Sequence, residues 1–191
     1  MRLNVLSDNE VQVLLTYLCT APPRDALIIR LMLQCGLRVG EIAALHVNQV
    51  WRDGYVSPAV NLPQATTKGH VARYVDIPQP LRGLIADHVK YLRSATIHFS
   101  PADPLFTGYK VRIRLQVSGI ERMVSKLSRA AIGRKIHPHV LRHTYATILL
   151  KYTNIRVVQT LLGHANLTTT ELYTHVNSED CKNAVNQAFN R

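Results

Sequence analysis

Apolar residues recur every three to four positions over most of the chain, a spacing typical of amphipathic helices. The run Ser7-Asp8-Asn9-Glu10 is a capping-box sequence, so a first helix is expected to begin there. The segment from Asp25 to about Cys35 is apolar nearly all round, which predicts a helix in the centre of the core. The same spacing predicts further helices at about residues 37–45, 80–95, 116–131, 138–152, 155–162, 168–175 and 179–190.

The helical spacing disappears between Asn48 and Pro78, where short β-branched and aromatic runs alternate with turn residues. Three of these runs are expected to be strands, and the polar turn 66–70 joins the last two into a hairpin with Lys68 near its tip. The strands are expected at residues 50–52, 59–62 and 72–77. The fold class predicted is therefore mainly α with a small antiparallel β-sheet of about three strands. With 191 residues and no internal repeat or obvious linker, residues 1–191 are expected to form a single domain.

The charge balance is strongly basic, with 23 lysines and arginines against 12 acidic residues and a net charge of +11. Such an excess indicates a polyanionic partner, most often nucleic acid, although a merely basic protein would show it too. The helix expected at 116–131 carries Arg122, Lys126 and Arg129 on the face opposite its apolar stripe. This face is either solvated or in contact with DNA phosphates.

The cysteines and the hydropathy of the chain indicate in which cellular compartment the protein is expected. The three cysteines are odd in number and far apart, which is typical of a reduced cytoplasmic protein without a disulfide framework. No apolar run reaches the roughly 18 residues of a membrane span, and the N-terminus lacks the features of a secretory signal. A soluble, cytoplasmic protein is expected.

Four residues in the last third suit chemistry on a phosphodiester: His139, Arg142, His164 and Tyr173. A tyrosine can be the nucleophile, but its phenol has a pKa near 10 and needs a base such as histidine. The planar fork of an arginine binds the phosphate oxygens and stabilises their developing charge. No acidic pair, cysteine pair or glycine-rich phosphate loop accompanies these residues. The combination predicts covalent phosphoryl transfer with Tyr173 as nucleophile.

Two residues nearer the N-terminus complete this chemistry. Arg38 lies between Gly36 and Gly40, which allow close approach of the backbone. Glu41, three residues after Arg38, is placed to orient its guanidinium. Lys68, near the hairpin tip, is the best-placed acid to protonate the leaving alkoxide. Because a phosphotyrosine linkage stores the energy of the broken bond, neither ATP nor any other cofactor is expected.

Five short motifs, taken jointly and in order, resemble the catalytic domain of tyrosine recombinases of the phage-integrase and Xer type. The resemblance covers nearly the whole chain and implies a mostly α domain with a small sheet. It also implies site-specific DNA recombination (integration, excision or inversion) by a homotetramer that joins two duplexes through a Holliday junction. The motifs are Gly36-Leu37-Arg38-Val39-Gly40-Glu41, Thr67-Lys68-Gly69, His139-Val140-Leu141-Arg142-His143, Leu162-Gly163-His164 and Tyr173-Thr174-His175-Val176.

The resemblance also implies a role for each catalytic residue. Tyr173 attacks the phosphate and becomes the 3′-phosphotyrosyl intermediate. Arg38 and Arg142 hold the phosphate, while His164 donates a hydrogen bond to it. His139 manages the proton of the tyrosine, and Lys68 protonates the 5′-oxygen.

Most members of this family carry an N-terminal core-binding domain of roughly 100 residues that closes around DNA and adds affinity. Because Met1 lies about seven residues before the first predicted helix, the chain is expected to be either a domain of a longer integrase or a naturally short recombinase. Two other functions remain open, namely a type IB-like DNA topoisomerase and a non-catalytic DNA-binding regulator.

Three further features have competing interpretations. The close spacing of His137, His139 and His143 suggests a metal site, but Arg134, Lys135 and Arg142 would repel a cation, so no metal is expected. Tyr145 is a rival nucleophile, but it is expected to turn into the packing of its helix. The tail, residues 179–191, has an apolar stripe that a short helix must bury, and it is expected to dock on a neighbouring protomer when DNA is bound. The stripe consists of Cys181, Ala184, Val185, Ala188 and Phe189.

Overall fold

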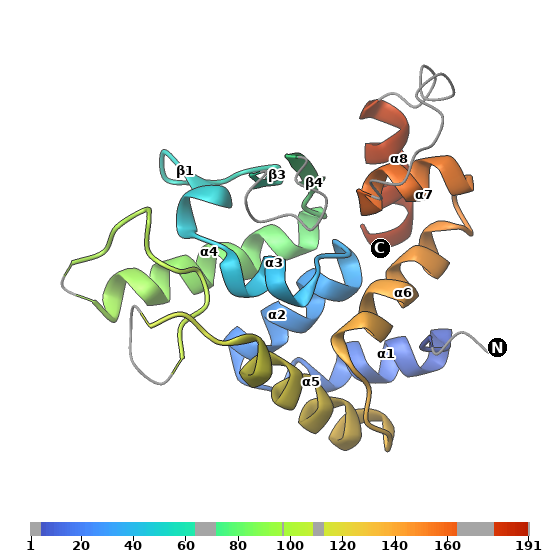
Figure 1. Cartoon of the computed structure of the whole chain (residues 1–191), viewed down its shortest axis with the longest axis horizontal. Coiled ribbons are helices and arrows are strands. Elements are labelled where there is room, and N and C mark those ends of the chain that lie inside the picture. Colours follow the sequence, from blue (N-terminus) through green and yellow to red (C-terminus); the bar gives the residue numbers. More distant parts are fainter. Residues whose placement is uncertain (1–4, 64–71, 97, 109–112, 164–177, 191) are drawn as a thin grey trace.

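Helices dominate the computed structural model, which describes residues 5–63, 72–96, 98–108, 113–163 and 178–190 (Figure 1). Eight of the predicted helices are present, and the one expected at 168–175 lies outside the described residues. No helix in the described part is long and apolar enough to cross a membrane. The α-helices are α1 (Asp8–Tyr17), α2 (Pro23–Gln34), α3 (Val39–Ala44), α4 (Gln79–Ser94), α5 (Val117–Ile132), α6 (Pro138–Leu149), α7 (Ile155–Leu162) and α8 (Ser178–Phe189).

Helix α2 is the centre of the larger core, as its sequence predicted. Proline at its first position lacks the backbone N–H that would have no partner within the helix, and all but its first three residues and Arg30 are buried. Helices α3, α4 and α6 pack around it (Figure 1). Each fully buried Leu or Ile contributes about 1.5–3 kcal/mol to folding, so this helix anchors the elements that carry the site.

Helix α1 begins at the predicted capping box. The Ser7 hydroxyl accepts a hydrogen bond from the Glu10 amide (3.2 Å), and the Glu10 carboxylate accepts one from the Ser7 amide (2.8 Å). Glu10 also forms an ion pair with Arg134, whose Nε lies 2.6 Å from Oε1. Hydrogen bonding to Arg134 holds the pKa of Glu10 at about 2. The carboxylate therefore caps α1 and ties it to the connection between α5 and α6.

The strands form two separate antiparallel ribbons, so the expected single sheet of about three strands was wrong in its arrangement. Strands β1 (Trp51–Arg52) and β2 (Tyr55–Val56) make one ribbon, and β3 (Ala59–Leu62) and β4 (Arg73–Asp76) make the other. Asp53 and Gly54 both have positive φ, the conformation of a two-residue hairpin, so the chain reverses at once and pairs with the unpredicted β2. The predicted antiparallel pairing of β3 with β4 is confirmed, with Leu62 opposite Arg73, and the predicted turn 66–70 lies outside the described residues.

A second, smaller core joins the end of α6 to α7 and α8 (Figure 1). The apolar stripe predicted for the tail is confirmed, because four of its members are buried and Ala188 packs against them. In this structure α8 covers α6 and α7 of its own chain. Docking on a neighbouring protomer therefore stays a prediction.

Candidate active site

Arg142 lies one turn into α6 and is 7% exposed. Its Nη1 donates to the carbonyl oxygen of Gly36, and its Nη2 donates to that of Leu162 at 2.6 Å. Gly36 has a φ of 65° and lies against Tyr145, where an added Cβ would come within 2.5 Å of the ring. No other residue would fit there without displacing Tyr145. The two carbonyls fix the plane of the Arg142 guanidinium before any ligand binds.

Arg38 stands at the start of α3, and its guanidinium faces the same helix end as that of Arg142. Its Nη1 donates to Glu41 Oε1 at 2.9 Å, and its backbone amide donates to Oε2 at 2.8 Å. The prediction that Glu41 orients Arg38 is confirmed. Nη2 of Arg38 lies 3.5 Å from the carbonyl oxygen of Leu162, which Arg142 also contacts. The structure thus brings together the two arginines that the sequence proposed as phosphate ligands.

Arg73 is a third arginine of the site, and the sequence interpretation missed it. It begins β4 with a side chain 11% exposed, and its Nη2 donates to both Glu41 oxygens at 3.0 and 2.9 Å. Its Nη1 donates to the carbonyl oxygen of Leu161 at 2.7 Å. Strand alternation could have identified it, because Arg73 lies on the same face as the buried Val75, and an inward-facing arginine needs an acidic partner.

The electrostatics of this cluster favour an anion. Arg38 and Arg73 both form ion pairs with the carboxylate of Glu41, whose side chain is 1% exposed. Arg142 lies beside them and shares the carbonyl oxygen of Leu162 with Arg38. Burial, reinforced by Arg38 and Arg73, lowers the pKa of Arg142 to about 9. Burial also lowers the pKa of Arg73, against the opposing effect of Glu41. With three guanidinium groups beside one carboxylate, the cluster carries uncompensated positive charge that a bound phosphate would neutralise.

His139 lies in the first turn of α6 and is exposed, one turn before the buried Arg142. Its ring centroid is 6.5 Å from that of His143. No group of three or more histidine, cysteine or acidic side chains able to hold a metal occurs in the described part of the chain. His139 therefore presents an exposed imidazole on the helix that carries Arg142.

Tyr145 is turned into packing, as predicted. It is completely buried and stacks on Phe189, with ring centroids 5.4 Å apart. Burial raises the pKa of its phenol far above the ordinary value. A phenol that neither reaches a substrate nor ionises cannot be the nucleophile.

Three of the predicted site residues, Lys68, His164 and Tyr173, lie outside the described residues, so their roles stay predictions. The end of the helix before His164 is as predicted: α7 ends at Gly163 with a φ of 60°. The carbonyls of its last turn are the ones that the three arginines contact.

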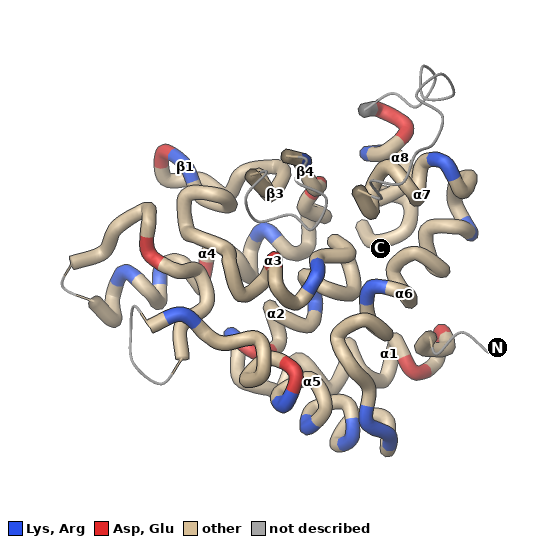
Figure 2. The backbone as a smooth tube through the Cα atoms, in the orientation of Figure 1, with Lys and Arg blue, Asp and Glu red and all other residues tan. Residues whose placement is uncertain are grey.

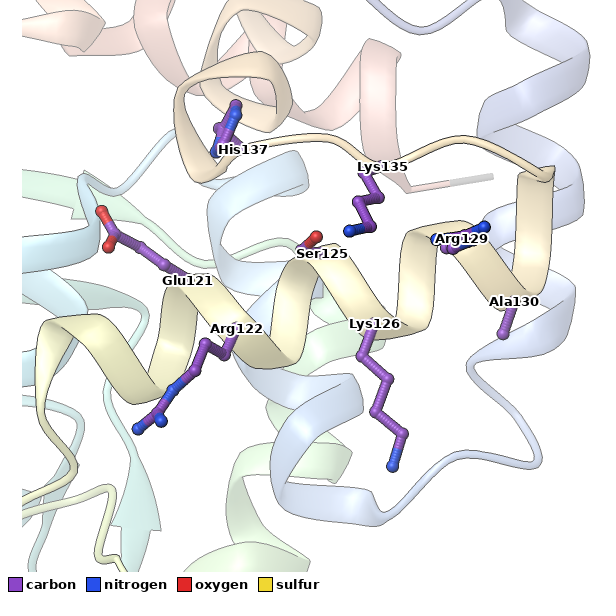
Figure 3. A pocket seen from close by; sticks show the side chains of 8 residues that line it. All are labelled: Glu121, Arg122, Ser125, Lys126, Arg129, Ala130, Lys135 and His137. Atoms are coloured by element: carbon purple, nitrogen blue, oxygen red, sulfur yellow. The ribbon is translucent and has the colours of Figure 1, made fainter.

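A basic groove of about 710 Å³ runs along α5 (Figure 3). Lys135 and His137 border it from the segment that connects α5 to α6, and α5 supplies the other side (Figure 3). Lysines and arginines recur along this helix and the segment after it (Figure 2). The α5 residues of the groove are Glu121, Arg122, Ser125, Lys126, Arg129 and Ala130. Because His137 directly precedes the first residue of α6, the groove leads to the turn that carries His139.

Comparison with known proteins agrees with this fold. The model of the phage integrase family matches residues 4–180, and the chain therefore belongs to that family. A tyrosine recombinase of Pseudothermotoga lettingae is 40% identical over 185 residues, which cover 95% of this chain and 59% of the relative.

Solved structures give the same result. The crystal structure of the XerA recombinase superimposes with a TM-score of 0.73 at 31% identity, over 93% of this chain and 62% of that one. The XerH recombinase, in a pre-cleavage complex with its difH substrate, shares the fold with a TM-score of 0.70 at 23% identity, over 95% and 51%. The mainly helical class with small antiparallel sheets is confirmed. The chain spans about half to three fifths of the length of these relatives.

Proposed function

We propose that the chain cuts and rejoins DNA at specific sites through a covalent 3′-phosphotyrosyl intermediate. The observation that carries this proposal is the arginine cluster, in which Arg38 and Arg73 pair with Glu41 and Arg142 lies beside them. Its surplus positive charge and restrained guanidinium groups suit the charge that develops on a phosphodiester in the transition state. Membership of the phage integrase family supports the same reaction.

Each catalytic residue has one role in the proposed reaction. The Tyr173 oxygen attacks the scissile phosphorus, the bond to the 5′-oxygen breaks, and the tyrosine becomes linked to the 3′-phosphate. Arg38 and Arg142 bind the non-bridging oxygens, and His164 donates to one of them. His139 accepts the proton of the tyrosine, while Lys68 delivers one to the departing 5′-oxygen. The reverse sequence, with a different 5′-hydroxyl as attacking group, rejoins the strands without metal or cofactor.

Double-stranded DNA is the proposed partner. The net charge of +11 and the basic groove on α5 provide sequence-independent attraction to the phosphate backbone. The related XerH recombinase is bound to its difH substrate in its crystal structure. We place the duplex along α5, from which the chain leads through His137 to the first turn of α6.

The test is covalent capture. The 191-residue chain is incubated with a pool of nicked duplexes whose sequence around the nick is randomised, and adducts that survive denaturation are recovered. A nick near the cleavage point lets the short leaving strand diffuse away, so the 3′-phosphotyrosyl adduct accumulates. We expect adducts on a defined sequence, with the linkage on Tyr173. Tyr173→Phe should abolish them and retain DNA binding, because the phenyl ring is kept and only the attacking oxygen is lost.

The capture separates this proposal from its alternatives. Adducts on all sequences alike would favour a topoisomerase, and DNA binding without any adduct would favour a regulator. An undiminished adduct in Tyr173→Phe would assign the nucleophile to another residue. The exposed Tyr91→Phe is the matched control, since it removes a phenolic oxygen far from the motifs.

We further propose a homotetramer on two duplexes in which α8 moves from its own chain to a neighbour. Burial of Phe189 against Tyr145 shows that the stripe on α8 needs an apolar partner. Labels at the exposed positions Gln187 and Thr147 would report this move, once the exposed Cys19 is replaced. We expect energy transfer within one chain to fall when the captured duplex is added to labelled protein diluted in unlabelled protein. Unchanged transfer in an assembled complex would mean that α8 stays on its own chain.

A further inference from the structure

We propose that Arg73 is a positioning residue for phosphate binding, which keeps donors of Arg38 available by sharing the Glu41 carboxylate with it. This inference rests on the proposed function, and it assigns a role to a residue outside the predicted catalytic set. The contacts of Glu41, of Arg38 and of the end of α7 each support it.

The first support is the way Glu41 is shared. An arginine and a carboxylate pair most favourably when two nitrogens of the guanidinium meet both oxygens. Here Arg38 reaches only Oε1 with its side chain, while Oε2 accepts hydrogen bonds from the Arg38 amide and from Nη2 of Arg73. Since Arg73 also contacts Oε1 at 3.0 Å, it occupies the position into which the Arg38 fork would otherwise close.

The second support is the state in which this leaves Arg38. Among the described residues, its Nη2 has one contact, at 3.5 Å to the Leu162 carbonyl oxygen, which is the weak limit of a hydrogen bond. Its side chain is 21% exposed, against 11% for Arg73. Arg38 is thus oriented by Glu41 and still open to a ligand, whereas both terminal nitrogens of Arg73 are committed to protein acceptors.

The third support is the end of α7. The last carbonyls of a helix lack partners within it and are stabilised by nearby cations. Arg73 donates to the Leu161 carbonyl and Arg142 to the next one, that of Leu162. Arg73 also lies against Gly163, where an added Cβ would come within 2.8 Å of its Cδ. One side chain therefore joins β4, α3 and the turn that ends α7.

Removal of Arg73 has a defined structural consequence. Without it, Glu41 would be a buried carboxylate with a single cationic partner, and the Arg38 fork would close on both of its oxygens. The donors that Arg38 needs for the phosphate would then be used within the protein. The charge of the site would fall as well, although Arg73 itself makes no contact with the substrate.

The first measurement is a crystal structure of Arg73→Met, which keeps the length of the side chain and removes its donors. We expect both terminal nitrogens of Arg38 on Glu41 and a displaced carbonyl at Leu161. If Arg38, Glu41 and Leu161 keep their positions, the proposal is overturned. This measurement needs no DNA, so it remains decisive even if the chain proves unable to cleave.

The second measurement is the rate of adduct formation in a single turnover on the captured duplex. For Arg73→Met we expect a fall of about 10- to 100-fold in rate with DNA affinity within about threefold, because transition-state contacts are lost and backbone contacts remain. Arg52→Met, which removes an exposed strand arginine, is the matched control and should cleave at the wild-type rate. A wild-type rate for Arg73→Met would overturn the proposal and leave the proposed function intact.

A substrate with a methylphosphonate at the cleavage point distinguishes positioning from general damage to the fold. This group lacks one negative charge, so cleavage depends less on Arg38, and the loss caused by Arg73→Met should shrink markedly. A variant that is slowed by misfolding would be slowed equally on both substrates, which would count against the proposal.

Arg73→Lys provides the second variant if Arg73→Met does not fold. It keeps a cation beside Glu41 but cannot reproduce the planar fork, so we expect an intermediate loss with the same dependence on substrate charge. No loss on either substrate would contradict the proposal. Failure of the wild-type chain to form any adduct would instead overturn the proposed function, and with it the catalytic part of this inference.

Discussion

The ring of Phe189 on α8 stacks on the ring of Tyr145 on α6, with centroids 5.4 Å apart and planes inclined by 10°. Tyr145 in turn lies against Gly36, whose carbonyl oxygen accepts a hydrogen bond from Arg142. Tyr145 therefore packs against both α8 and the Gly36 backbone, whose carbonyl orients Arg142. This arrangement makes the position of α8 relevant to the active site.

Phe189→Ala should lower the free energy of unfolding by about 3 kcal/mol, because it leaves a cavity beside Tyr145 in the smaller core. Urea denaturation of the DNA-free protein measures the change. Ile155→Ala, at a position 54% exposed, is the control and should change stability by less than about 0.5 kcal/mol. Equal effects of the two substitutions would mean that the stacked pair adds little to stability.

Arg38→Ala should slow strand cleavage by about a hundredfold or more, since a charge donor to the transition state contributes about 3 kcal/mol. Binding of the same duplex should weaken much less, because many other basic residues contact the backbone. Arg142→Ala should slow cleavage similarly, and it should also lower stability, because two buried carbonyls lose their donor. Single-turnover rates and equilibrium binding, measured on one duplex, separate these effects. Equal losses in binding and cleavage would argue against a transition-state role.

Lys68→Ala should be rescued by a duplex whose 5′-bridging oxygen is replaced by sulfur. Sulfur leaves without a proton, so the general acid is no longer needed. His139→Ala should not be rescued on this substrate, because the sulfur does nothing for the proton of the attacking tyrosine. The ratio of rates on the oxygen and sulfur substrates is the measurement. A sulfur substrate that fails to restore cleavage would leave Lys68 as a contact to phosphate or base only.

The Glu10–Arg134 ion pair predicts a defined dependence of stability on pH. Hydrogen bonding to Arg134 lowers the pKa of Glu10 from 4.5 to about 2. A carboxylate whose pKa is lower in the folded state contributes stability that is complete above pH 4.5 and is lost as the pH falls toward 2. Glu10→Gln should therefore lower the free energy of unfolding by about 1 kcal/mol at pH 6, discounted for partial exposure. Near pH 2 the difference should vanish, and a difference of the same size at both pH values would contradict this origin.

Local patterns predicted the helices well, because periodic burial and capping residues act within a few positions of the chain. The capping box at Ser7, the apolar α2 and the α7 end at Gly163 all depend on such short-range information. The strands were predicted less well. The run 50–52 was expected to join one sheet, but Asp53 and Gly54 close a tight hairpin, and the pairing partner of a strand is a long-range choice.

The candidate site likewise has one part that short spacings predicted and another that only the tertiary structure brought together. The spacing of Arg38 and Glu41 placed them on one helical turn, so their ion pair was predictable. Arg73 is 32 residues further along the chain and joins Glu41 only because β4 packs beside α3 and α7. No spacing rule covers such a contact. The only indication in the sequence was strand alternation, which places Arg73 on the same inward face as Val75.

The sequence by itself determined the helical class, the excess of basic residues and the pairing of Arg38 with Glu41, because these depend on residue type and on short spacings. The tertiary structure alone decided that Arg38 and Arg73 share the Glu41 carboxylate, and that both meet Arg142 at the last carbonyls of α7. It also decided that Tyr145 is buried between Gly36 and Phe189. The physical reason is that burying charge is costly unless partners from several elements converge, and convergence of distant segments is a property of packing rather than of local sequence.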